Sequence, residues 1–138
     1  MNDIVVNKIQ SIQRCILRAR EELALAGAGF AEDHSRQDAA VLNVTRACEQ
    51  AIDLANHVVR VRRLGIPVSS ADAFDLLARA GIVPRDLAER LRRMIGFRNV
   101  AVHAYQELDL AIVEAVIRTG LDDLVALGDA VLALEPPI

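Results

Sequence analysis

The first half of the chain carries two helical patterns separated by glycines. Between residues 4 and 26, apolar residues recur at alternating spacings of three and four, the pattern of an amphipathic helix. Gly27 and Gly29 predict its end. A second helix of about thirty residues should begin after Glu32 and Asp33. Its apolar stripe is formed by Val41, Val44, Cys48, Ala51, Ala55 and Val58.

The second predicted helix also has a polar stripe with the same spacing. It consists of Asn43, Arg46, Gln50, Asp53, His57 and Arg60. At 100° per residue this stripe lies about 160 to 200° away from the apolar one. Asp53 and His57 are four residues apart, so Asp53 could hold His57 or Arg98 in place. An exposed, salt-bridged face is the alternative.

The second half of the chain predicts three more helices. Ser70 can cap a short helix over residues 71–80, and Gly81 closes it. Pro84 suits the first turn of a fourth helix. The buried stripe of that helix should contain Leu87, Leu91, Met94 and Val102. A last helix from about Asp109 should bury Leu110, Val113, Ile117, Leu124, Leu127 and Val131.

No segment shows the alternation of a strand, so we expect an all-α, antiparallel bundle of four long helices and one short one. Neither a repeat nor a linker divides the chain, which predicts a single domain over residues 1–138. Charges interrupt every apolar run and no export signal is visible, so we expect a cytoplasmic protein without a membrane span. Cys15 and Cys48 are interpreted as small core residues. We expect neither a cofactor nor a metal, because no ligand cluster is present.

The charge is unevenly distributed. The net charge is −3, but residues 60–98, here called the basic block, contain nine arginines and four acids. Such a block could bind a polyanion or an acidic partner, or it could be a solvated face.

Residues 98–105 combine three side chains that suit phosphate chemistry: Arg98, His103 and Tyr105. Arg98 falls on the apolar stripe of its helix and therefore needs an ion-pair partner, a subunit interface or a polar cleft. His103 lies about 140° around an unbroken helix from Arg98. The two can meet only if the helix unwinds after Val102 or if a second subunit supplies half of the site.

The pattern Arg98, four residues, His103, Ala104, Tyr105 resembles the RxxxxHxY motif of HepT-like proteins, a branch of the HEPN superfamily that includes many ribonucleases. The resemblance extends over residues 37–40, 51–57, 65–67 and 94–99, together with Ser69, Asp72 and Phe74. It implies a HEPN-like homodimer that acts as a type VII toxin and whose partner is an MntA-type nucleotidyltransferase antitoxin.

The resemblance also implies roles for individual residues. His103 and Arg98 would be catalytic in a cleft that binds RNA, Asn99 would support them, and Tyr105 would receive AMP from the antitoxin. Metal-independent RNA cleavage needs a base for the 2′-hydroxyl and a cation for the phosphorane, and these residue types fit. One alternative is a non-catalytic subunit of a two-component nucleotidyltransferase that binds a nucleotide or a partner. The other is a dimerisation module in which the trio is structural.

Overall fold

The computed structural model describes residues 3–138, and this part of the chain is helical without a strand. The α-helices are α1 (Asp3–Ala26), α2 (His34–Arg62), α3 (Asp72–Arg79), α4 (Arg85–His103), α5 (Leu110–Ala115) and α6 (Asp122–Leu132). Two 3₁₀ segments, η1 (Gly27–Glu32) and η2 (Tyr105–Glu107), and a π turn, η3 (Val116–Gly120), connect them. The all-α prediction is confirmed. No helix between residues 3 and 138 is both long and apolar enough to cross a membrane.

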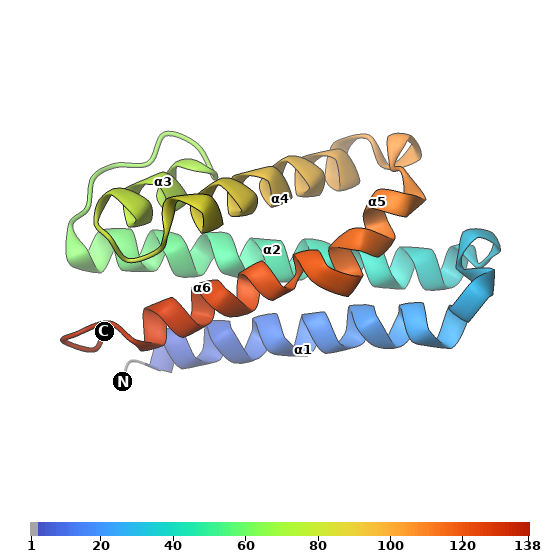
Figure 1. Cartoon of the computed structure of the whole chain (residues 1–138), viewed down its shortest axis with the longest axis horizontal. Coiled ribbons are helices and arrows are strands. Elements are labelled where there is room, and N and C mark those ends of the chain that lie inside the picture. Colours follow the sequence, from blue (N-terminus) through green and yellow to red (C-terminus); the bar gives the residue numbers. More distant parts are fainter. Residues whose placement is uncertain (1–2) are drawn as a thin grey trace.

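α2 is the central helix of the bundle. It lies between α1 and α4 and also contacts α3 and α6 (Figure 1). All six residues of its predicted apolar stripe are buried. The interpretation of the polar stripe as an exposed face is wrong at Asn43 and His57, which are buried as well. A helix covered by neighbours on several sides has no wholly exposed face. Asn43 compensates by donating a hydrogen bond to the carbonyl of Ala39, at 2.9 Å.

Polar contacts hold the start of α2 in place. Asp33 caps the helix, and its carboxylate accepts a hydrogen bond from the amide of Arg36, at 3.1 Å. Such a cap contributes about 1 kcal/mol. Buried Gln37 donates from Nε2 to the carbonyls of Phe30 and Ala31, at 2.6 and 2.9 Å. These bonds tie η1 to α2 and thereby fix the position of the first turns of α2.

The short helix begins differently from the prediction. α3 starts at Asp72 after Ala71, and no side chain caps it, so the predicted Ser70 cap is wrong. The carboxylate of Asp72 turns back instead and accepts a hydrogen bond from the amide of Val68, at 2.9 Å. Gly81 follows α3 with a φ of 75°, a conformation that favours glycine, and Pro84 directly precedes α4.

The predicted last helix is interrupted at η3. Arg20 of α1 reaches this turn and donates from Nε to the carbonyl of Ile117, at 3.0 Å, while its Nη2 bonds Asp122 at 2.8 Å. A π turn departs from the usual helical hydrogen bonding, and Arg20 donates to two carbonyls of this turn, those of Ile117 and Arg118. The predicted core residues from Val113 onward are nevertheless buried, and Leu110 is half-buried.

Candidate functional site

α4 is unbroken from Arg85 to His103. Unwinding after Val102 is therefore not the way in which Arg98 and His103 meet, and within one chain they lie about 140° apart around the helix. The helix ends at His103. The next residue, Ala104, has φ and ψ of −145° and 53°, and η2 follows it directly.

Arg98 is largely enclosed, with 14% of its side chain exposed, and it forms an ion pair with Glu49 of α2. The distance from Arg98 Nη1 to Glu49 Oε1 is 3.2 Å. Arg98 Nε is buried and has no hydrogen-bond partner within residues 3–138. Of the three surroundings predicted for Arg98, the structure shows an ion-pair partner, and the buried Nε is left without a hydrogen bond.

The end of α4 is more exposed than its pattern predicts. Val102, predicted on the buried stripe, is 49% exposed, whereas its neighbour Ala101 is buried. The face that packs on the core thus ends at Ala101, because beyond this point α4 extends past the buried part of the bundle. Asn99 and His103 are exposed on the same segment, so both can contact a ligand or a second subunit.

Tyr105 begins η2 and is 40% exposed. Its hydroxyl donates a hydrogen bond to Asp38 Oδ1, on the second turn of α2. Partial burial and this contact with Asp38 raise the pKa of Tyr105 to about 12. The phenol is therefore protonated near neutral pH and is held against α2.

Asp53 and His57 do not form the predicted interaction. Exposed Asp53 pairs with Lys8 of α1 at 3.4 Å, and it holds neither His57 nor Arg98. His57 faces the interior, is 6% exposed, and places Nδ1 3.2 Å from Nη2 of Arg60. Burial lowers the pKa of His57, and the positive charges of Arg60 and Lys8 lower it further. Positions i and i+4 often pair on a helix, but here Asp53 contacts Lys8 and His57 contacts Arg60 instead.

Two acids near the motif, Glu49 and Asp38, were absent from the predicted site. α2 contains three acidic residues, Asp38, Glu49 and Asp53, and an arginine on the apolar stripe of another helix requires an anion. The sequence analysis offered Asp53 for this role, but the choice among the three depends on how the two helices are rotated against each other. Asp38 also belongs to a segment of the family resemblance, residues 37–40.

Within residues 3–138, no group of three or more histidine, cysteine or acidic side chains is arranged to hold a metal ion. Both cysteines are free. Cys48 is buried, as predicted, and burial raises the pKa of its thiol to about 12. Cys15 is half-buried against the core.

Part of the basic block is neutralised by acids of the same chain. Arg79 and Arg85 both pair with Asp75, and Arg90 pairs with Asp86 and Asp123. These pairs agree with the interpretation of the block as a solvated face over this part of the surface.

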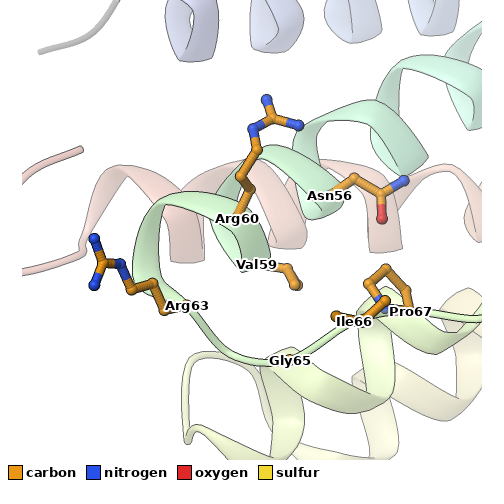
Figure 2. Close-up of a pocket in the computed structure, with 7 residues that line it drawn as sticks. All are labelled: Asn56, Val59, Arg60, Arg63, Gly65, Ile66 and Pro67. Carbon is orange, nitrogen blue, oxygen red and sulfur yellow. The ribbon is translucent and has the colours of Figure 1, made fainter.

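A separate pocket of about 580 Å³ lies at the carboxyl end of α2, at the far end of that helix from Asp38 (Figures 1 and 2). Its lining consists of Asn56, Val59, Arg60, Arg63, Gly65, Ile66 and Pro67. Figure 2 shows the guanidinium groups of Arg60 and Arg63 pointing away from each other. The pocket therefore does not concentrate their two charges on one ligand.

Comparisons with known proteins agree with the resemblance. A family model described as "Ribonuclease HepT-like" matches residues 12–131. An mRNA nuclease HepT of Shewanella oneidensis is 45% identical over 133 residues, which cover 96% of this chain and 99% of that protein. A structure of the tri-AMPylated Shewanella oneidensis HEPN toxin in complex with MNT antitoxin superposes with a TM-score of 0.92 at 45% identity, covering 97% of this chain and 100% of that one. A toxin-antitoxin structure with AMP-PNP gives a TM-score of 0.92 at 44% identity, covering 96% of this chain and 100% of the other. The chain therefore belongs to the Ribonuclease HepT-like family, with a HEPN toxin fold.

Proposed function

We propose that this protein is a HepT-like toxin of a type VII toxin-antitoxin pair and a metal-independent endoribonuclease of the cytoplasm. One observation carries the proposal: a complete Arg98, His103 and Tyr105 motif stands where α4 emerges from the core, with His103 and Tyr105 exposed. The related mRNA nuclease HepT, 45% identical over nearly its whole length, supports the same activity.

In this proposal two copies form a homodimer and their motifs line one cleft. Each copy is a single domain of residues 1–138 with four long helices, where α5 and α6 count as one interrupted helix. The divergence of Arg98 and His103 around α4 supports this arrangement, because a second subunit can place its own His103 near Arg98. Val100, Val102 and Ile112 are exposed near the end of α4 and offer apolar surface for the contact.

RNA cleavage then divides between the two side chains. His103 takes the proton of a ribose 2′-hydroxyl, which attacks the adjacent phosphate and leaves a 2′,3′-cyclic phosphate. Arg98 stabilises the charge on the phosphorane oxygens through its guanidinium. Asn99, next to Arg98 and exposed, supports the site by contacting RNA.

Regulation in this proposal occurs through Tyr105, to which an MntA-type nucleotidyltransferase antitoxin attaches AMP. The added phosphate is an anion close to the cleft, so it competes with the RNA phosphate for Arg98. The related toxin was seen tri-AMPylated and bound to its antitoxin, which supports Tyr105 as the acceptor because this chain has one tyrosine.

The activity is tested by incubating the purified protein with RNA in EDTA and analysing the ends of the fragments. We expect cleavage with cyclic phosphate ends, and a loss of at least about 100-fold in His103→Ala. His34→Ala is the matched control, because His34 is also exposed but lies at the start of α2. Cleavage by His103→Ala at the wild-type rate would refute the catalytic role of His103.

The alternative function is a non-catalytic subunit that binds a nucleotide or a partner. The ion pair between Arg98 and Glu49 favours a role without catalysis, because Glu49 already neutralises the charge that a phosphorane would need. Calorimetry that detects nucleotide or partner binding by a protein that cleaves no RNA at micromolar concentration would select this alternative.

A further inference from the structure

The hydrogen bond between Tyr105 and Asp38 joins two segments that are 67 residues apart in the sequence. α4 ends at His103, and the hydrogen bond to Asp38 places Tyr105, the first residue of η2, against the second turn of α2. The carboxylate of Asp38 thus contacts the phenol oxygen, the atom that must form a new bond when AMP is attached.

A tyrosine hydroxyl in this environment is a weak nucleophile. Its pKa of about 12 leaves almost no phenolate near neutral pH, so the proton has to leave while the new bond forms. A group that takes this proton must lie within hydrogen-bond reach of the hydroxyl. Asp38 fulfils that requirement in the unmodified chain.

We propose that Asp38 is the general base for AMPylation of Tyr105 and also positions its hydroxyl for attack, an inference that rests on the proposed function. The Tyr105 oxygen attacks the α-phosphorus of ATP, and an oxygen–phosphorus bond forms. The bond between the α-phosphorus and the bridging oxygen of pyrophosphate breaks, and pyrophosphate leaves with the electron pair. The phenol proton passes to Asp38 Oδ1. Asp38 is exposed and then releases the proton to water.

In this scheme the toxin chain itself supplies the general base for its own modification. The transferase has to bind ATP and orient its α-phosphate toward Tyr105, but it need not supply a base for the acceptor. Two roles of Asp38 can be separated by substitution. Asparagine preserves a carbonyl oxygen that accepts the hydrogen bond, but it cannot take the proton.

The test measures the transfer of label from ATP labelled at the α-phosphate. Wild-type protein, Asp38→Asn and the control Asp129→Asn are each incubated with the MntA-type nucleotidyltransferase of the same organism. Asp129 is an exposed aspartate of α6, in a part of the bundle remote from η2 (Figure 1). Circular dichroism and thermal melting establish that each variant is folded.

We expect Asp38→Asn to lower the labelling rate at least about 100-fold, the smallest contribution usual for a general base, and Asp129→Asn to match the wild type. Labelling of folded Asp38→Asn within about threefold of the wild-type rate would overturn this inference alone. A wild-type protein that takes up no label would overturn both this inference and the proposed modification. RNA cleavage by the same preparation reports on the nuclease activity separately.

Discussion

Glu49 and Arg98 form an ion pair between α2 and α4 in which the two partners are unequally exposed. The Glu49 side chain is 47% exposed and the Arg98 side chain 14%, with 3.2 Å between Oε1 and Nη1. Water around the Glu49 carboxylate screens its charge and weakens its attraction for Arg98, whose guanidinium is largely enclosed by the protein. In the proposed nuclease, an RNA phosphate that approaches from solvent would replace Glu49 as the anion opposite Arg98.

Replacing Glu49 tests how much this ion pair contributes to the free energy of unfolding. Because one partner is half exposed, we expect Glu49→Gln to lower the free energy of unfolding by about 1 kcal/mol, well below the cost of breaking a fully buried pair. Urea denaturation measures the change. Glu114→Gln is the control, because Glu114 pairs at 3.7 Å with Arg118, whose side chain is 63% exposed, and it should change stability by less than about 0.5 kcal/mol. Equal losses in both variants would contradict this explanation.

Mixing two inactive variants tests whether the site is shared between subunits. Arg98 and His103 point apart on one α4, so a working pair should consist of Arg98 from one subunit and His103 from the other. A mixed dimer of Arg98→Ala and His103→Ala retains one such pair. We expect RNA cleavage to return on mixing, to at most about half of the wild-type level per dimer. Native mass spectrometry confirms exchange, and exchanged but inactive dimers would argue against a shared site.

Tyr105 can be titrated without interference, because the chain has one tyrosine and no tryptophan. At pH 11 a free phenol is about nine-tenths ionised, but a pKa of about 12 keeps most of the Tyr105 population protonated. Absorbance at 295 nm immediately after a pH jump should rise little in the wild type and more in Asp38→Asn. If both proteins ionise like free tyrosine, the contact between Tyr105 and Asp38 does not persist in solution.

His57 should make stability depend on pH. Its pKa is lowered in the folded state from the ordinary value of 6.5, so the unfolded chain binds the proton more tightly. Its contribution is complete above pH 6.5 and is lost as the pH falls through 6.5 toward the lower folded pKa. One proton limits this slope to about 1.4 kcal/mol per pH unit. Urea denaturation at several pH values should show a shallower slope for His57→Gln than for the wild type, and identical slopes would rule out this role.

The helices could be predicted from the sequence because each long helix buries a stripe, and burial imposes the spacing of three and four. The π turn could not, because Arg20, whose side chain satisfies its carbonyl, lies 97 residues away from Ile117 in the sequence. The burial of Asn43 and His57 also escaped prediction. A helical wheel divides one helix into two faces, whereas α2 is covered on several sides.

The candidate site was predictable in its residues but not in its contacts. The position of Arg98 on an apolar stripe indicated a need for an anion, and the structure supplies one. Identifying Glu49 rather than Asp53 requires the axial shift and rotation of α2 against α4. Small packing differences along both helices determine this shift and rotation, and the spacing of apolar residues within one helix does not predict them.

The bond between Tyr105 and Asp38 cannot survive the modification that we propose. An esterified tyrosine oxygen has no proton to donate, and its phosphodiester places a negative charge beside the carboxylate of Asp38. Like charges at this distance repel, so the modified side chain should swing away from α2 and release η2. AMPylation would then loosen the connection between α4 and α5 as well as occupy the cleft, and faster amide hydrogen exchange in residues 104–109 would mark the silenced toxin.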